Sequence, residues 1–254
     1  MSTLAFIPAR SGSKGVINKN IKTLDGIPLL AYSVYIAQIC KERKIIDDIL
    51  VSTDSPEYLS QLSNIDYHTD YLRPKELAGD ASPTIDALVD ALNFFREQDK
   101  YFDKVLILQP TSPFRTISQI KSAISLMIND PSCTCIASVF KLGDYHPMRI
   151  KKIAMNGYLD DFCAEYLEPE PSRRQDFSPK AFIRSGSIYL SRTKQILEEG
   201  LIRGKKVLPL EVSEVFSINV DEELDFFKAE AVINSGIYKN ELKLFNELKT
   251  FYET

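Results

Sequence analysis

Short apolar segments alternate with amphipathic segments along most of this chain, and this alternation is what most limits the folds open to it. Residues 4–7, 49–51 and 105–108 are continuous apolar runs, a pattern typical of strands buried on both faces of a parallel sheet. The segments between them have helical periodicity, and in residues 85–95 the apolar side chains recur on one face. The alternation predicts an α/β protein, a three-layer sandwich around a mostly parallel sheet with right-handed crossovers.

The alternation is interrupted between residues 141 and 181, where prolines, charges and aromatic residues follow one another with weak periodicity. It resumes with strands predicted at residues 182–190 and 215–220. A final helix is predicted from an apolar stripe that consists of Ile237, Leu244, Leu248 and Phe251. A chain of 254 residues can form one large core. We therefore predict a single domain over residues 1–254, with residues 141–181 as an inserted arm.

Charge and cysteine content narrow the environment and the partners of the chain. The formal net charge is -4, which argues against a nucleic-acid partner because nucleic-acid-binding domains carry a basic surplus. The first apolar run is too short to cross a bilayer, and no signal-peptide pattern precedes it. The four cysteines lack paired metal-ligand spacing, so we interpret them as reduced thiols. These features predict a cytoplasmic protein without a membrane partner.

A basic, glycine-rich loop follows the first predicted strand. Residues 8–20 contain two glycines and two serines together with Arg10, Lys14 and Lys19. Such a loop can turn its backbone N–H groups towards an anion, and ligands of α/β sheets bind beyond the carboxyl ends of the strands. The Walker A pattern and the dinucleotide-binding glycine pattern are both absent. The alternative is a solvated basic turn, but the position of the loop favours phosphate binding.

A second polar segment, residues 109–115, directly follows the apolar run 105–108. A turn stiffened by proline would explain Pro110 and Pro113 but gives no reason for Gln109 or Arg115. Polar side chains at the end of a buried strand can hold a ligand. This segment is therefore a second candidate for the binding site.

A third candidate is the pair Asn219 and Asp221 at the end of the last predicted strand. Alternate residues of a strand share a face, so the two oxygen donors can point at one cation. Mg²⁺ suits such a site because it needs few protein oxygens when phosphates and water supply the others. Asp221 could instead be the N-cap of a helix that begins near Glu222. The spacing leaves both interpretations open.

Several motifs together resemble those of the CMP-sialic acid synthetase family (acylneuraminate cytidylyltransferases). They occur in the order of that family at residues 7–15 with Lys19 and Asn20, 51–54, 72–78 with Asp80, 108–113 and 185–189. The resemblance implies a nucleotide-diphospho-sugar transferase-like fold with a dimerisation arm, and hence a homodimer. It also implies Mg²⁺ as cofactor, and CTP and an acidic nine-carbon 2-keto sugar as substrates.

The reaction implied by the resemblance is transfer of CMP from CTP to the anomeric hydroxyl of a sugar of the N-acetylneuraminic or legionaminic type, with release of pyrophosphate. Arg10, Lys19 and Asp221 would be catalytic, and Asp221 and Asn219 would bind the metal. The residues implied to contact the nucleotide are Arg10, Ser13, Lys14, Lys19, Asn20, Arg73, Ser82, Thr84 and Gln109. Those implied to contact the sugar are Gln109, Arg149, Arg174, Gln175, Ser185 and Tyr189, some of them reaching across the dimer.

The chain departs from the family pattern at two positions. Many relatives have two aspartates where this chain has Asn219 and Asp221, and Ser185 with Gly186 replaces a frequent Asn-Gly pair. Either change could accompany a different sugar. The alternatives are therefore the same reaction on Kdo or pseudaminic acid, or a nucleotide-binding protein without catalysis. The general base is not identified by the sequence.

Overall fold

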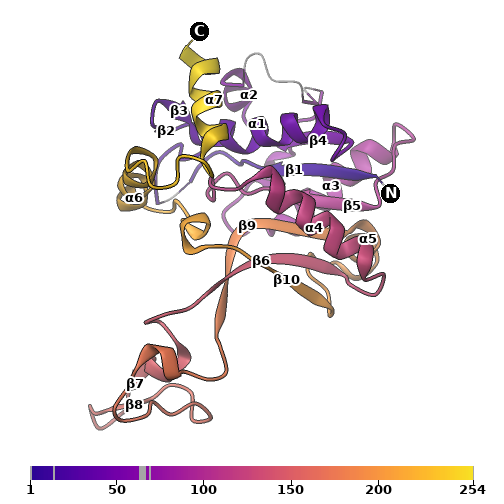
Figure 1. Cartoon of the computed structure of the whole chain (residues 1–254). Helices are drawn as coiled ribbons and strands as arrows, with labels where there is room; N and C mark the ends of the chain where they lie inside the picture. The colour runs from indigo at the N-terminus through magenta and orange to yellow at the C-terminus, as the bar shows by residue number, and fades with distance from the viewer. Residues whose placement is uncertain (1, 14, 63–66, 69, 254) are drawn as a thin grey trace.

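A six-stranded sheet forms the centre of the computed structural model, which describes residues 2–13, 15–62, 67–68 and 70–253 (Figure 1). Its strands, in spatial order, are β10 (Val207–Glu211), β6 (Cys135–Lys141), β9 (Phe182–Arg192), β5 (Lys104–Ile107), β1 (Thr3–Pro8) and β4 (Asp48–Ser52). Strand β1 is parallel to β4 and β5, and β10 is parallel to β6, whereas β9 is antiparallel to both of its neighbours. The prediction of a mostly parallel sheet in an α/β fold is confirmed.

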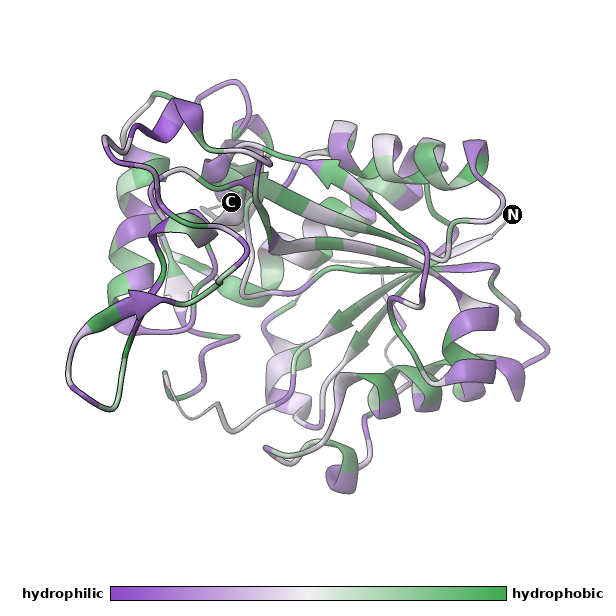
Figure 2. Ribbon diagram, turned by 90° about the horizontal axis from the view of Figure 1, so that it is seen from below, coloured by the Kyte–Doolittle hydropathy of each residue, from purple (hydrophilic) through white to green (hydrophobic). Residues whose placement is uncertain are grey.

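Helices cover both faces of this sheet (Figure 2). Alternate side chains of β1 divide between the two sides, since Ala5 and Ile7 belong to one buried cluster and Leu4 and Phe6 to the other. The first cluster includes residues of α1 (Leu29–Glu42), α2 (Pro56–Ser60), α4 (Ile117–Asn129), α6 (Glu223–Asn234) and α7 (Lys243–Glu253). The second includes residues of α3 (Thr84–Arg96) and α5 (Thr193–Glu199). The chain therefore has three layers, as predicted.

The predicted strand at residues 215–220 is wrong. That segment contains a 3-10 helix, η4 (Glu214–Ser217), and the strand of this region is β10, which pairs with β6. Pro209 in the middle of β10 concealed the strand pattern. Because β10 is an edge strand, it can accommodate a residue that lacks a backbone donor.

The final helix is also shorter than predicted, because Ile237 lies outside it. Helix α6 ends at Asn234, α7 begins at Lys243, and Gly236 between them has a left-handed φ of 68°. Ile237 is 75% exposed, whereas Leu244 packs against the core and Leu248 belongs to it. The side chain of Phe251 lies outside the described residues.

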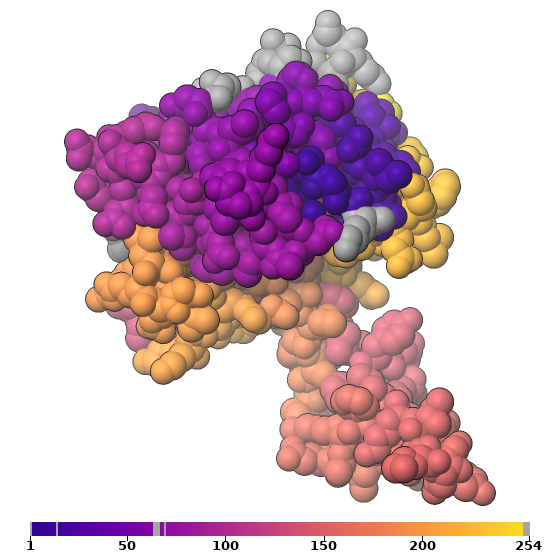
Figure 3. Space-filling model, turned by 180° about the vertical axis from the view of Figure 1, so that it is seen from behind, coloured from indigo at the N-terminus to yellow at the C-terminus, as the bar shows by residue number. Residues whose placement is uncertain are grey.

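Residues 142–181 leave the sandwich as an arm between β6 and β9 (Figures 1 and 3). The two strands pair as far as Lys141 and Phe182, where the arm begins and ends. The arm contains η2 (Pro147–Arg149), β7 (Lys151–Ile153), β8 (Leu159–Asp161) and η3 (Arg174–Asp176). Its base is tied together by His146, which is buried and whose Nε2 lies 2.9 Å from the carbonyl of Pro179.

Two small elements remain: the hairpin of β2 (Thr23–Leu24) with β3 (Ile27–Pro28), and the 3-10 helix η1 (Lys75–Leu77). No helix in the part of the chain that the structure describes is long and apolar enough to cross a membrane.

A buried carboxylate stabilises the fold at the amino edge of the sheet. Asp48 opens β4, its side chain is 5% exposed, and it contacts Lys100 at 2.6 Å and the Nε2 of His68 at 2.9 Å. Burial opposes ionisation of Asp48, but the hydrogen bonds from Lys100 and His68 outweigh burial and hold its pKa at about 2. The unfolded chain therefore binds more protons than the folded chain between the two pKa values.

We expect Asp48→Asn to lower the free energy of unfolding by roughly 2 kcal/mol at neutral pH. This deficit should shrink as the pH falls from about 4 to about 2, because wild-type Asp48 is protonated in that window. Urea unfolding of both proteins at several pH values measures the difference. Asp70→Asn is the control, because this exposed partner of His68 forms a weak surface pair. If the difference in free energy of unfolding between wild type and Asp48→Asn did not change with pH, the low pKa assigned to Asp48 would be contradicted.

Candidate active site

The segments that follow β1 and β5 meet at the carboxyl edge of the sheet and enclose a cavity of about 530 Å³. Nine residues that the sequence predicted as site residues line it: Arg10, Ser13, Lys19, Asn20, Arg73, Ser82, Thr84, Gln109 and Asp221. They come from positions spread over more than 200 residues of the chain. Lys14, also predicted here, lies outside the described residues.

The loop after β1 is held in shape by hydrogen bonds with the side chains of Asp54 and Asn20. Asp54 accepts hydrogen bonds from the backbone N–H and the hydroxyl of Ser11, at 2.8 and 2.6 Å. Burial raises the pKa of Asp54, but these hydrogen bonds outweigh it and lower the pKa below its usual value. Asn20 is buried and donates to the carbonyl of Arg10 at 3.0 Å. These contacts fix the described part of the loop around Arg10 and Ser11 before any ligand binds, which reduces the entropy that binding costs.

Gly15 is required where this loop meets the segment before α6. A Cβ at Gly15 would lie 2.7 Å from the backbone oxygen of Asp221, closer than real Cβ contacts. Because Gly15 has no side chain, the loop after β1 can pack against the backbone of Asp221, and the two together form one wall of the cavity.

Three cations gather in this cavity although the chain as a whole is acidic. Arg10 pairs with Asp80 at 2.9 Å, and the Nζ of Lys19 lies 2.7 Å from the carboxylate of Asp221. Arg73 is 5% exposed and donates to the hydroxyl and carbonyl of Ser52, at 2.9 and 2.7 Å. Burial lowers the pKa of Arg73, yet an arginine stays charged at neutral pH. This arrangement suits a polyanion such as a triphosphate.

Asp221 is an exposed carboxylate at the rim of the cavity and is not a helix cap. Glu222 is the N-cap of α6, and its capping box is completed by Asp225. The N-cap interpretation of Asp221 is therefore wrong. Asn219 reaches Asp221 through its amide nitrogen, while its amide oxygen accepts a hydrogen bond from Ser112 at 3.1 Å. Asn219 does not line the cavity of about 530 Å³ in the part of the chain that the structure describes.

The protein side chains at this cavity can bind a divalent cation only if a bound ligand supplies most of the oxygens that coordinate the ion. Among the described residues, no cluster of three or more His, Cys, Asp or Glu side chains could hold a metal by itself. Asp221 offers one carboxylate beside a cavity that can receive phosphates. One carboxylate plus phosphates and water is a shell that Mg²⁺ accepts.

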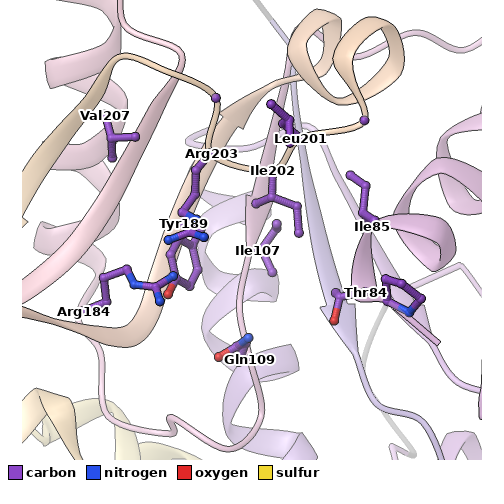
Figure 4. Close-up of a pocket in the computed structure, with 13 residues that line it drawn as sticks. Thr84, Ile85, Ile107, Gln109, Arg184, Tyr189, Leu201, Ile202, Arg203 and Val207 are labelled. Carbon is purple, nitrogen blue, oxygen red and sulfur yellow. The ribbon is translucent and has the colours of Figure 1, made fainter. Parts of the chain in front are cut away.

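Two further hollows adjoin the first one, and Gln109 lines all three. One, of about 500 Å³, has an apolar wall that includes Ile107 and Ile202 (Figure 4). The other, of about 420 Å³, is lined by Asn219 among other residues. Tyr189 lines both of these hollows. The three hollows form one cleft with Gln109 at its centre, and the hollow of about 500 Å³ extends from the carboxyl edge over the sheet to Val207 at the start of β10.

The hydroxyl of Ser185 is not positioned to contact a sugar directly. It lines the hollow of about 420 Å³ but is 4% exposed, and its hydroxyl bonds to those of Ser138 and Ser187, at 2.7 and 2.9 Å. The hydroxyl of Ser185 thus stabilises the pairing of β9 with β6 and is not free for a ligand.

Two arginines of the cleft were missed by the sequence analysis. Arg184 is exposed and lines both hollows beside Tyr189, and Arg203 joins them in the hollow of about 500 Å³ (Figure 4). A basic residue directly before the Ser185–Gly186 turn was a usable signal for Arg184. Arg203 lies in the loop after α5, where no sequence pattern pointed to a site.

The arm residues predicted to contact the sugar lie apart from this cleft within one chain. Among the described residues that line the three hollows, none is Arg149, Arg174 or Gln175. Arg149 instead pairs with Asp144 at 2.8 Å and with Glu168 at 3.3 Å inside the arm. Figure 3 shows the arm projecting from the body of the molecule. The fold of a single chain therefore does not bring the two groups of predicted sugar contacts together.

Comparisons with known proteins agree with this geometry. Residues 4–231 match the family model described as "Cytidylyltransferase". The chain is 31% identical over 237 residues to the CMP-N,N'-diacetyllegionaminic acid synthase of Legionella pneumophila, covering 92% of this chain and 97% of that protein. It is 29% identical to the N-acylneuraminate cytidylyltransferase of Escherichia coli, covering 88% of this chain but only 50% of that longer protein.

A further relative and a solved structure complete the comparison. The pseudaminic acid cytidylyltransferase of Campylobacter jejuni is 28% identical, with 90% of this chain and 95% of that protein covered. The structure of CMP:2-keto-3-deoxy-manno-octonic acid synthetase, complexed with CTP, is similar with a TM-score of 0.63 over 93% of this chain and all of that one. At 16% identity this last likeness supports the fold alone.

Proposed function

The chain belongs to the cytidylyltransferase family, among the CMP-sialic acid synthetases, and we propose that it transfers CMP from CTP to a nonulosonic acid. The observation that carries the proposal is the cavity that unites Arg10, Lys19 and Arg73 with Asp221. A triphosphate is the ligand class whose charge these three cations would balance.

In this reaction the anomeric hydroxyl oxygen of the sugar attacks the α-phosphorus of CTP. The bond from that phosphorus to the bridging oxygen breaks, pyrophosphate leaves, and the hydroxyl proton passes to solvent or to a base. Phosphoryl chemistry of this kind depends mainly on positioning and charge neutralisation. Arg10 and Lys19 would bind the phosphates and offset the negative charge that develops on the departing pyrophosphate.

Mg²⁺ is the cofactor we propose, with Asp221 as its protein ligand. When bound, the ion would neutralise phosphate charge and favour ionisation of the attacking hydroxyl. Lys19, whose Nζ lies 2.7 Å from Asp221, would hold this carboxylate in position at the cavity. The geometry favours Asp221 over Asn219, whose amide oxygen accepts from Ser112.

The sugar would occupy the two hollows beyond Gln109. Their polar groups, among them Arg184 and Tyr189, suit a carboxylate and hydroxyl groups. The apolar wall of Ile85, Ile107 and Ile202 suits the methyl groups of acylamino substituents. This wall favours an N-acylated sugar of the legionaminic or neuraminic type over Kdo, and the name of the Legionella relative points to the legionaminic type.

A homodimer is proposed because the predicted sugar contacts divide between the cleft and the arm. An arm that projects from one chain can complete the cleft of a partner chain, placing Arg149, Arg174 and Gln175 beside its sugar. The arm carries exposed apolar side chains, including Met155, Tyr158 and Leu159, and exposed apolar surface of this kind marks contact sites.

Shared sites predict that two inactive variants can restore activity when mixed. Lys19→Ala disables the cleft of its own chain, whereas Arg174→Ala disables the arm that would serve the partner. A mixed dimer keeps one site with both residues intact. Refolding or coexpressing equal amounts should recover about a quarter of wild-type activity, because about half of the dimers are mixed and each has one intact site. No recovery, although mixed dimers form, would contradict the shared site.

The decisive test of the function is pyrophosphate release with CTP, Mg²⁺ and a panel of acids: N,N'-diacetyllegionaminic, N-acetylneuraminic and pseudaminic acids, and Kdo. We expect release with the legionaminic or neuraminic sugar, and none with ATP or without a sugar. Asp221→Ala should abolish it. A folded protein that binds CTP but releases no pyrophosphate with any of the four acids would instead indicate nucleotide binding without this catalysis.

A further inference from the structure

Asp221 is held by a line of polar contacts that runs from the buried Ser112 through the exposed Asn219. Ser112, which is fully buried, donates its hydroxyl to the amide oxygen of Asn219 at 3.1 Å. The amide nitrogen of Asn219 donates to one carboxylate oxygen of Asp221, and the Nζ of Lys19 lies 2.7 Å from the other. The carboxylate is thus fixed at both of its oxygens.

The direction of these bonds follows from the chemistry of the groups. An ionised carboxylate can only accept hydrogen bonds, so the part of the Asn219 amide that faces Asp221 must be its NH₂. The amide oxygen then faces the hydroxyl of Ser112, which can donate to it. In this orientation Asn219 does not offer its oxygen to a cation bound at Asp221.

The base of this line is anchored in the protein core. Arg115 is 1% exposed and donates to the carbonyl of Gln109 at 2.6 Å and to that of Ser112. The backbone N–H of Val220 also donates to the carbonyl of Thr111 at 2.6 Å. The loop after β5 therefore fixes both the backbone and the side chains of the segment that carries Asp221.

We infer that Asn219 is a positioning residue for Asp221, and that Ser112 in turn positions Asn219. The inference rests on the proposed metal role of Asp221 and extends it to two residues that would not touch the ion. An exposed aspartate without such partners would sample several rotamers, and each binding event would have to restrict it. Hydrogen bonds behind a metal ligand commonly change metal affinity about 10- to 100-fold.

The test is Mn²⁺ binding in the presence of CTP, followed by the loss of the free-ion electron paramagnetic resonance signal. We expect Ser112→Ala and Asn219→Ala each to weaken Mn²⁺ binding about 10- to 100-fold. The double variant should be no weaker than Asn219→Ala, since both residues act through the same contact. If Asn219 were a metal ligand, Ser112→Ala would free the amide oxygen of Asn219 to bind the ion. Mn²⁺ binding by Ser112→Ala that is as tight as in wild type, or tighter, would therefore overturn the inference.

Two controls separate the possible failures. Ser191→Ala removes another buried serine hydroxyl of the sheet, which donates to the sulfur of Cys135 at 3.4 Å, and it should leave Mn²⁺ binding unchanged. Asp221→Ala should weaken binding at least as much as Asn219→Ala. If Asp221→Ala bound Mn²⁺ as tightly as wild type, the proposed metal site itself would be refuted. If Asp221→Ala bound Mn²⁺ weakly but Ser112→Ala bound it normally, only the positioning role would be refuted. Circular dichroism confirms that each variant is folded.

Discussion

Lys19→Ala is expected to lower kcat for CMP transfer by about 100- to 1,000-fold, the usual effect of removing one preorganised group that stabilises developing charge. Lys19 lines the cavity between the phosphate-loop candidate and Asp221, and its side chain is 12% exposed. A cation in such a partly dehydrated position interacts strongly with phosphate oxygens. Because the charge on pyrophosphate grows as it leaves, kcat should fall more than the affinity for CTP. Steady-state pyrophosphate release measures kcat, and equilibrium binding of CTP measures the affinity.

Lys22→Ala is the matched control for this variant. Lys22 belongs to the same segment but pairs with Glu223 and lies over the ring of Phe226, 4.9 Å from its centre. It does not line the cavity among the described residues, so its loss should leave kcat near the wild-type value. Equal losses in the two variants would mean that Lys19 acts through the stability of the segment and not on the phosphates. Thermal unfolding of both variants should remain close to that of wild type, because such ion pairs stabilise little.

Gly186→Ala is expected to reduce kcat/KM for the sugar by about 10-fold, less than the roughly 100-fold cost of a 1 Å displacement, because Ser112 and Gln109 need to shift by only a few tenths of an ångström. A Cβ at this position would lie 3.1 Å from the hydroxyl oxygen of Ser112 and 3.2 Å from the Oε1 of Gln109. Gln109 lines all three hollows of the cleft, so its displacement disturbs both substrates. Gly186 also has a φ of 78°, which costs an alanine about 1–2 kcal/mol.

Gly26→Ala is the control that separates the two effects of Gly186→Ala, the strain of a positive φ and the contact of the new Cβ with its neighbours. Gly26 has a similar φ of 82°, but nothing lies within 4 Å of the position its Cβ would take. It should show the loss of stability without the loss of activity. If Gly186→Ala and Gly26→Ala retained the same kcat/KM, the contact with Gln109 would have no part in catalysis.

Local patterns were enough to predict the framework of the fold and the edge that carries the site. The apolar runs at residues 4–7, 49–51 and 105–108 form strands because a segment buried on both faces must be apolar throughout. The same reasoning failed for β10, since Pro209 on an edge strand breaks the pattern without breaking the strand. The candidate segments after the strands could be named because loops after parallel strands meet at one edge, and the other site residues came from the resemblance to the family.

The roles of individual polar residues depended on partners that are distant in sequence. The residue pattern of one segment pointed to both Gln109 and Arg115, yet Gln109 lines the cleft and Arg115 is buried beneath it, where burial lowers its pKa to about 9. Ser185 was predicted to face the ligand, but its hydroxyl is bonded to Ser138 on the neighbouring strand. The neighbouring Arg184, which was not predicted, lines the cleft instead.

The sequence by itself determined the α/β class, the positions of the strands that form the carboxyl edge, and the family to which the motifs belong. The class and the strand positions follow from periodicity, which acts over short stretches of chain, whereas the family follows from the resemblance of the motifs. Only the tertiary structure decided which groups meet: Ser112 reaches Asn219, and Lys19 reaches Asp221, 202 positions further along the chain. Hydrogen bonds require a donor and an acceptor within about 3 Å, and at such separations in sequence only the packing of the whole sheet and its helices sets that distance.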